Sequence, residues 1–541
     1  MNFDDILDKI GSFGNFQKTL HVWMCLPQIF LACHTLVSVF TGAVPPHICR
    51  SRWPLAGNQA LPLNISQAAG PGGGPDLSCT ALDTQELANL SKALVLSKNH
   101  TTEGCAGGWE YSKEIFSSTV VTEWDLVCNK AKLNTIASSI YMFGLLVGAL
   151  LSGVLADKYG RRIIILVGLA VQATFGVGTA FAPNVCTYMF FRFVVGMTVS
   201  AVIMNIFVLG TEWTGQKHRM LAGLLTDYFF GLGYIMLAGV AYLIRDWRTL
   251  QLAVSLPEFL FFFYIWVLPE SARWLITKGK KKEAVDLIQK AALRNRNPLP
   301  PNFELFQQPN ELNGEAKKKK GTLVDLVRTP RMRKRSLILF YLWFVNSLVY
   351  YGLSLNITTF GMNIYLTQFI FGLVEIPART IILFTINRSR KICLICFFVT
   401  GGLACLSTIF VPDKMPILRI LLAMIGKFGI TGSVSVIYIY SAEVFPTVIR
   451  QNGMGMSSMC ARTGGIVSPI MHLLASNRKE APMAVFGICP LVGAALALML
   501  PETAGKPLPD TIKDVEQTQC REDAAEKALY KQAPGSLEVI I

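Results

Sequence analysis

The chain has 541 residues, of which 52% are hydrophobic and only 16% are charged, and its formal net charge is +15. A soluble protein of this length could not hide so much apolar surface in one core, so the composition excludes an ordinary soluble protein. The apolar residues fall into about twelve segments, each long enough to cross a bilayer. The basic residues gather in short loops between these segments, which follows the positive-inside rule and argues against a nucleic-acid-binding surface.

Residues 1–19 are a predicted cytoplasmic N-terminus, and the first span follows near residues 20–42. The N-terminal stretch carries Asp4, Asp5 and Asp8, and it has neither a basic region nor a small-residue cleavage site. A cleavable signal peptide needs both of these features. We therefore expect no cleavable signal peptide, and the first span itself should start insertion.

The segment from 45 to 132 has the features of an external domain. It contains seven Lys/Arg and eight Asp/Glu residues, so it lacks the basic excess of a cytoplasmic loop. It also carries three glycosylation sequons and four cysteines, which an oxidising exterior would join in two disulfides. Because four cysteines can pair in more than one way, the pairing stays open. The sequons are at Asn64, Asn89 and Asn99, and the cysteines are Cys49, Cys79, Cys105 and Cys128.

Five further spans complete an N-terminal six-helix bundle, predicted over residues 20–275. They lie near 133–155, 163–182, 187–210, 219–243 and 250–268. A linker from 276 to 335 follows, with sixteen Lys/Arg against six Asp/Glu, and this excess predicts a cytoplasmic location.

Six more spans form a predicted C-terminal six-helix bundle over residues 336–504. They lie near 336–356, 364–386, 392–411, 416–440, 453–474 and 481–500. The tail from 505 to 541 is polar, and we expect it to be cytoplasmic and disordered.

The two halves of the chain repeat one another. Glu212 after span 4 is followed seven residues later by Arg219, and Glu443 after span 10 is followed at the same spacing by Arg450. A Pro-Glu pair after span 6, at 269–270, recurs after span 12 at 501–502. The two motif pairs share an offset of 231 or 232 residues. Duplicated six-span halves predict a transporter whose halves rock around a midplane site.

A loop motif between spans 2 and 3 has the form G-x-x-x-D-x-x-G-R-R and covers residues 153–162. Its glycines should allow close helix approach and a tight turn. Arg161 and Arg162 can reach Glu212 and Glu270, and such a cluster would latch the two halves when the cavity faces outward and would have to break when it opens inward. The alternative is that the two arginines serve only to orient the chain in the membrane.

The corresponding segment of the second half, residues 387–391, has neither the acid nor the glycine of the first motif. Its latch should therefore be weaker or built differently. We assign a gating role to the charged residues of these motifs and to one cation inside span 10. They are Asp157, Arg161, Arg162, Glu212, Arg219, Glu270, Lys427, Glu443 and Arg450.

These motifs, together with the segments 269–275 (PESARWL), 350–355 (YYGLSL) and 508–511 (LPDT), resemble the solute carrier family 22 organic ion transporters of the major facilitator superfamily. The resemblance covers nearly the whole chain to about residue 515. Residues 365–379 (YLTQFIFGLVEIPAR) are similar to the organic anion branch.

The resemblance implies an all-α membrane protein with the major facilitator fold, in which twelve transmembrane helices form two six-helix pseudo-repeats. It implies a multi-pass protein of the plasma membrane with cytoplasmic termini and a monomeric transport unit among membrane lipids. It implies neither a cofactor nor a metal.

Arginines inside spans are the strongest candidates for contacting substrate, because ionisable residues there cost several kcal/mol unless they serve a function. Arg379 lies in span 8 and Arg462 in span 11. Guanidinium groups suit a carboxylate or a sulfate. Anion carriers of the resembling family have cations at the matching positions, whereas cation carriers typically have an acid at the Arg462 position. The alternative for Arg379 is an internal salt bridge to Glu375, four residues away.

Aromatic residues should complete the binding site, since a drug-sized ion buries most of its surface against apolar walls. The resemblance favours Tyr228 and Phe230 on span 5 and Tyr350 and Tyr351 on span 7, although each of them could simply pack between helices. We add His34 on span 1, with a proton-linked switch and ordinary hydrogen-bonded packing as its other interpretations.

Three further ionisable residues lie inside spans. Lys427 should have a structural or gating role, paired with Asp227 or Glu443. Asp227 and Glu258 argue for a cation site instead, because a buried carboxylate is what a cation site requires.

The sequence thus predicts a secondary transporter of small organic anions, working by alternating access through exchange with a counter-anion or by facilitated transport. The alternative is a carrier of organic cations or carnitine-like zwitterions that uses Asp227, Glu258 or Glu375. An enzyme is not expected, because the sequence has no zinc-ligand spacing and no nucleophile with a credible base. Without a P-loop, any driving force must come from gradients.

Overall fold

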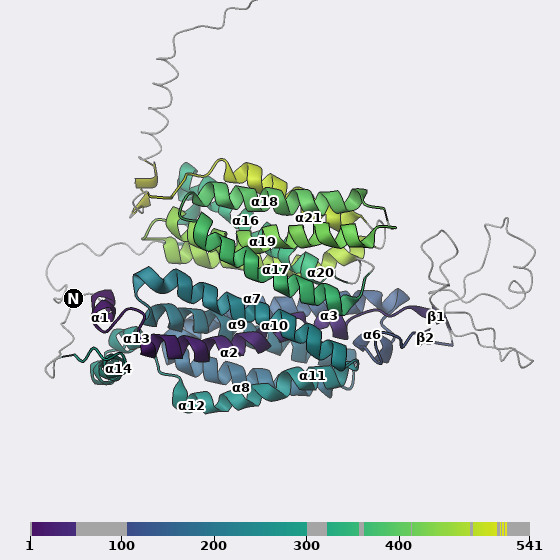
Figure 1. The fold of residues 1–541 in the computed structure, drawn as a ribbon, viewed down its shortest axis with the longest axis horizontal. Coiled ribbons are helices and arrows are strands. Elements are labelled where there is room, and N and C mark those ends of the chain that lie inside the picture. The colour runs from purple at the N-terminus through teal and green to yellow at the C-terminus, as the bar shows by residue number, and fades with distance from the viewer. Residues whose placement is uncertain are drawn as a thin grey trace, which may run out of the picture.

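The computed structural model describes residues 3–49, 105, 107–299, 322–355, 357, 362–412, 414–475, 480–505, 509, 511, 512 and 514–516. Within these residues two bundles of long helices lie side by side (Figure 1). The only sheet of the described residues is a short antiparallel pair at one end of the molecule, where β1 (His47–Cys49) pairs with β2 (Trp109–Tyr111). We call this end the β end and the opposite one the linker end.

The first bundle contains the helices from the N-terminal half. Its long helices are α2 (Asn15–Leu36), α7 (Ala131–Tyr159), α8 (Arg161–Ala180), α9 (Val185–Trp213) and α10 (Arg219–Leu243). The sixth span is divided into α11 (Trp247–Ser255), the 3-10 helix η3 (Leu256–Phe263) and α12 (Tyr264–Val267). Pro257 explains this break, because proline removes a helical N–H donor and clashes with the preceding turn.

The second bundle contains the helices from the C-terminal half. They are α16 (Pro330–Leu355), α17 (Ile364–Thr385), α18 (Arg390–Ser407), α19 (Pro416–Val444), α20 (Arg450–Ala475) and α21 (Ala481–Ala497). The short 3-10 helix η5 (Thr408–Phe410) extends α18. The two bundles meet where α7 packs on α20 and where α10 packs on α17.

Short elements occupy both ends of the molecule. The linker end carries α1 (Phe3–Lys9), η2 (Gln216–His218), α13 (Ala272–Thr277), α14 (Lys281–Arg294) and α15 (Asp325–Arg328). The β end carries α3 (Ser38–Thr41), α6 (Val120–Glu123) and η1 (Cys128–Lys130). Asn295, just after α14, holds the N-terminal segment by donating to the carbonyl of Ile10 over 2.8 Å. Residues 281–294 of the predicted linker are thus an ordered helix.

Ten membrane-length apolar spans are present among the described residues. The two other predicted spans correspond to α21, which is apolar but shorter, and to α20, which carries more polar residues. The predicted all-α architecture is confirmed. Several boundaries differ: α16 begins at Pro330 instead of 336, and Glu212 and Glu443 lie inside the last turns of α9 and α19 and not after them. Hydropathy marks the apolar centre of a span, whereas backbone hydrogen bonds continue into its polar ends.

Glycine allows α7 and α9 to pack with their backbones in contact. A Cβ atom on Gly148 would lie 2.0 Å from the carbonyl oxygen of Met197, and one on Gly144 would lie 2.3 Å from that of Phe193. Gly153, which we expected to allow such packing, has nothing within 4 Å of the same position. The glycines that matter for helix contact therefore lie one to two turns before the loop motif.

Gly148→Ala should destabilise the protein by about 1–3 kcal/mol, because the added methyl group overpacks a backbone contact that cannot move independently. Thermal unfolding of the detergent-purified protein measures the effect. Gly153→Ala, on the same helix, is the matched control and should unfold at or slightly above the wild-type temperature. Equal losses in both variants would show that the α7–α9 contact is not responsible.

Candidate functional site

The loop motif forms a charge cluster at the linker end of the first bundle. Arg161 Nη2 lies 3.0 Å from Asp157 Oδ1 and 3.4 Å from Glu212 Oε1. Glu270 accepts hydrogen bonds from the backbone N–H groups of Arg161 and Arg162, over 3.0 and 3.3 Å, and so caps the N-terminus of α8. Gly160 makes room for this carboxylate, since a Cβ there would lie 2.3 Å from Glu270 Oε2 at a φ of +103°.

The contacts just described all join residues of the first bundle, so in this structure they brace one half. The latch expected in the outward-facing state stays a prediction, whereas the expected contact between the Arg162 side chain and Glu270 was wrong. The guanidinium group of Arg162 donates to the carbonyl of Ile265 and does not pair with Glu270. Residue spacing showed which groups come near one another, but not that Glu270 would bind backbone N–H groups.

The second bundle repeats the arrangement with different residues. Glu502 accepts from the backbone N–H of Arg390 at 3.1 Å and of Lys391 at 3.3 Å, as well as from the Ser389 hydroxyl. Arg390 Nε lies 3.2 Å from Glu443, which matches the Arg161–Glu212 pair. Burial of Glu502 opposes ionisation, but these hydrogen bonds outweigh it and hold its pKa below the usual value. Ser389 stands before Arg390 as Gly160 stands before Arg161, and its hydroxyl also caps α18 by accepting from the backbone N–H of Ile392. The cluster is therefore built differently, as the sequence indicated.

The repeated arginines, Arg219 and Arg450, bind the turns that follow the fourth helix of each half. Arg219 Nε donates to the carbonyls of Thr211 and Thr214, over 3.3 and 3.2 Å. Arg450 Nε donates to the carbonyl of Phe445 over 3.2 Å. Both therefore stabilise carbonyl groups that a helix end leaves without intrahelical partners.

A buried charge cluster surrounds Glu375 on α17. Its carboxylate lies 3.0 Å from Arg379 Nη2 and 3.2 Å from Lys427 Nζ, and the hydroxyl of Tyr350 donates to it over 2.5 Å. Lys427 also donates to the Ser354 hydroxyl over 2.7 Å, and its Nζ lies 3.3 Å from the ring centroid of Tyr350. The predicted partners of Lys427, Asp227 and Glu443, were wrong. We refer to Glu375, Arg379, Lys427 and Tyr350 as the Glu375 cluster.

The Glu375 cluster extends across the boundary between the bundles. Arg379 donates to the backbone carbonyl of Asp227 on α10, and its Nε lies 4.0 Å from the Asp227 carboxylate. Next to it, the hydroxyl groups of Tyr228 and Thr380 lie 2.7 Å apart. The Asp227 side chain stays 44% exposed. Arg379 therefore has two acidic neighbours, and its expected pairing with Glu375 is present.

Arg462 on α20 has a different environment. It lies close to Tyr351 on α16, and Tyr141 on α7 and Tyr438 on α19 belong to its wider surroundings. Within the part of the chain that the structure describes, Arg462 forms no ion pair. We call these four residues the Arg462 cluster. Phe230, the remaining aromatic candidate, is half-buried on α10.

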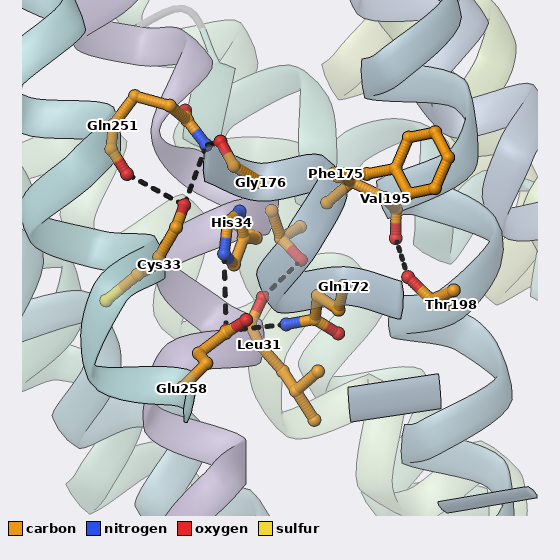
Figure 2. A network of polar contacts seen from close by, with 12 residues as sticks. Leu31, Cys33, His34, Gln172, Phe175, Gly176, Val195, Thr198, Gln251 and Glu258 are labelled. Carbon is orange, nitrogen blue, oxygen red and sulfur yellow. Dashed lines mark hydrogen bonds and ion pairs between the residues drawn. The ribbon is translucent and has the colours of Figure 1, made fainter. Parts of the chain in front are cut away.

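His34 belongs to a third polar group, inside the first bundle (Figure 2). Its Nε2 lies 3.2 Å from Glu258 Oε1 on η3, and Gln172 on α8 donates to the same oxygen over 2.6 Å. All three side chains are buried. His34 and Glu258 are thus partners of one another, and Glu258 is not a free carboxylate for a cation.

Arg192 on α9 was missed by the sequence analysis. It is 2% exposed, its Nη1 donates to the His34 carbonyl over 3.1 Å, and its guanidinium group lies 4.5 Å from the ring centroid of Tyr141. A charged residue in the middle of an apolar span is the signal that could have found it.

At the β end, aromatic side chains close the boundary between the bundles. Tyr365 at the start of α17 stacks on Phe40 of the first bundle with ring centroids 5.5 Å apart, and it also contacts Tyr242 at 5.6 Å. Its hydroxyl donates to the Ile115 carbonyl over 3.1 Å. At the linker end of the same boundary helices, Val154 and Phe384 are 72% and 78% exposed. The structure is therefore closed at the β end.

The external segment is described only in part. Cys49 and Cys105 form a disulfide, and Cys128 is disulfide-bonded as well. Cys79 and the three sequon residues Asn64, Asn89 and Asn99 lie outside the described residues.

Comparisons with known proteins fit this geometry. Residues 89–512 match the model of the family "Sugar (and other) transporter". Solute carrier family 22 member 13 of Homo sapiens is 40% identical, with 95% of this chain and 93% of the relative covered. Solute carrier family 22 member 6-A of Xenopus laevis is 38% identical, with 96% and 94% covered. The chain belongs to solute carrier family 22.

Two further similarities of this family 22 chain concern the ion that a relative carries and the fold. The organic cation transporter protein of Drosophila melanogaster is 38% identical, with 95% of each chain covered. The inward open conformation of the xylose transporter XylE from E. coli has a TM-score of 0.59 at 15% identity and covers 93% of this chain and 99% of its own, which shows the major facilitator fold. This family 22 chain is a multi-pass membrane transporter and not an enzyme.

Proposed function

We propose that this chain carries small organic anions across the plasma membrane by alternating access, and that Arg462 recognises the negative charge. One relative is named an organic cation transporter, and others are named only as members of family 22. The family therefore supports transport of an organic ion but does not give the sign of its charge. The sign of the charge has to come from the site.

The charge balance inside the bundles supports an anion. Glu375 is neutralised by Lys427 and Arg379, and Glu258 lies beside His34. Arg462, by contrast, has no ion-pair partner among the described residues, and it lies close to Tyr351. A carboxylate or a sulfate can supply the missing charge through bidentate hydrogen bonds, and tyrosine rings and hydroxyls suit an aromatic anion.

The closed β end supports alternating access. The boundary between the bundles is sealed there by the Tyr365 contacts, whereas apolar side chains of α7 and α17 are exposed at the linker end. We take the β end as external, since it carries the disulfide-bonded segment. Closure at one end of the boundary is what one state of an alternating-access cycle requires, and transport then requires the two charge-braced bundles to rock as rigid bodies.

Asp227 is the residue that would favour a cation instead, because its carboxylate is partly exposed between the bundles. The deciding experiment is uptake into proteoliposomes containing the purified chain, with labelled aryl carboxylates, aryl sulfates and quaternary amines compared at equal concentration. We expect saturable uptake of the anions, competition between them, and no competition by the amines. Uptake of the amines without uptake of the anions would reject the proposed charge selectivity.

A further inference from the structure

The buried pair of His34 and Glu258 has no part in the proposed anion site, and it lies where a titratable group is costly to keep. Both side chains are fully or almost fully buried, between α2, α8 and η3 (Figure 2). The position is shaped for the imidazole ring: a Cβ on Gly176 would lie 3.0 Å from His34 Cε1. The pair also lies next to the break in the sixth span, where the 3-10 helix η3 begins with a proline and interrupts the α-helix.

The number of protons on the pair sets its net charge. With one proton it is either an imidazolium–carboxylate pair or two neutral groups, so its net charge is zero. Loss of that proton leaves one uncompensated negative charge inside the bundle. Glu258 Oε2 has no hydrogen-bond partner among the described residues, so this oxygen can carry a proton without breaking a contact.

Arg192 connects the pair with the Arg462 cluster. It donates to the His34 carbonyl on one side, and on the other its guanidinium group lies against the Tyr141 ring. Tyr141 belongs to the wider surroundings of Arg462, and its hydroxyl lies 3.1 Å from that of Thr35, the residue after His34. Arg192 forms no ion pair within the described ranges of the chain. A net charge on the neighbouring His34–Glu258 pair can therefore offset the positive charge of Arg192.

The surroundings of His34 contain few other titratable groups. The groups that α8, α10 and α11 contribute around His34 are uncharged. They are Gln172, Gly176, Gly233, Gln251 and Ser255. The charged or titratable neighbours on α2, α7, α9 and η3 are Cys33, Tyr141, Arg192 and Glu258.

We propose that the His34–Glu258 pair is a proton-binding site and that its proton is coupled to anion binding at the Arg462 cluster. When the pair holds its proton, the charge of Arg192 adds to that of Arg462 and favours an anion between the bundles. When the proton leaves, the net negative charge of the pair offsets Arg192 and weakens anion binding. Because coupling between two ligands is reciprocal, a bound anion also strengthens proton binding. This inference rests on the proposed anion function and adds a coupled ion to it.

The first test measures how anion uptake depends on pH, with an aryl sulfonate probe whose own charge does not change. Wild-type uptake should fall severalfold when the external pH is raised over the range of about 5 to 8. The double variant His34→Gln/Glu258→Gln keeps hydrogen-bonding side chains but removes both titratable groups, so it should transport with a flat pH profile. Ser255→Ala is the matched control from the same polar group, and it should keep the wild-type slope.

The second test needs no variant, so it holds even where a variant fails to reach the membrane. Proteoliposomes with a trapped pH-sensitive dye should acidify inside when the aryl sulfonate is added outside. Sulfonate uptake without acidification, or an unchanged pH slope in His34→Gln/Glu258→Gln, would overturn the proton coupling while leaving the anion function intact. Absence of any anion uptake at any pH would instead reject the proposed function.

Discussion

Arg462→Glu should abolish uptake of a labelled aryl carboxylate while the protein still reaches the cell surface. The substitution removes a guanidinium group that forms no ion pair within the described residues and lies close to Tyr351, and it adds a charge that repels the substrate. Loss of a charge-assisted contact of this kind costs about 2–5 kcal/mol, which is about 30-fold or more in apparent affinity. Uptake normalised to surface biotinylation measures the effect.

Graded variants separate charge from shape at this position. Arg462→Lys keeps the charge but not the bidentate geometry, so it should retain weak uptake with a raised KM, and Arg462→Gln should retain less. Thr463→Ala is the matched control, since Thr463 is exposed on the same helix and its hydroxyl bonds only to the Met459 carbonyl, over 3.1 Å. Undiminished anion uptake by Arg462→Glu would remove Arg462 from the substrate site.

Glu375→Gln should cause the largest loss of stability. It leaves Lys427, which is fully buried, without its carboxylate, and it leaves Arg379 with Asp227 alone. Removing one partner of a buried ion pair costs about 3–5 kcal/mol, a large share of the about 5–15 kcal/mol by which a typical protein is stable. We expect a much lower unfolding temperature in detergent and little protein at the cell surface.

A second substitution should reverse part of this loss. In Glu375→Gln/Lys427→Met the buried ammonium group is gone, so the double variant should be more stable than Glu375→Gln alone, and the cycle gives the coupling between the two residues. Arg388→Gln, an exposed cation just after α17, is the control and should shift stability by less than about 0.5 kcal/mol. A double variant that is as unstable as the sum of the two singles would show that the pair does not act as a unit.

Local sequence features predicted where the motifs lie in the two halves, but not which groups form hydrogen bonds with them. The offset between the Pro-Glu motifs correctly indicated equivalent places in the two halves, and the structure shows Glu270 and Glu502 capping α8 and α18 in the same way. It did not indicate that backbone N–H groups would be the donors. That choice depends on how closely the turn approaches the helix end, and at Gly160 a left-handed φ sets this distance.

Pairings between distant helices were the least predictable part of the candidate site. The Glu375–Arg379 pair was anticipated because residues four apart share a helix face. The pairing of Lys427 with Glu375, by contrast, joins α19 to α17, and that of His34 with Glu258 joins α2 to η3. Such contacts depend on the rotation and tilt of each helix, which packing at small residues such as Gly148 and Gly176 decides.

The sequence by itself determined that this protein is a duplicated bundle of membrane-spanning helices. The length of each apolar segment decides whether it crosses the bilayer, and the repeated polar motifs lie at helix ends, so both are local properties of the chain. Only the tertiary structure decided which of the charges inside the bundles are paired with an opposite charge and which are not. Charges in a medium of low dielectric select partners by distance across helices, and those distances exist only once the two bundles have packed.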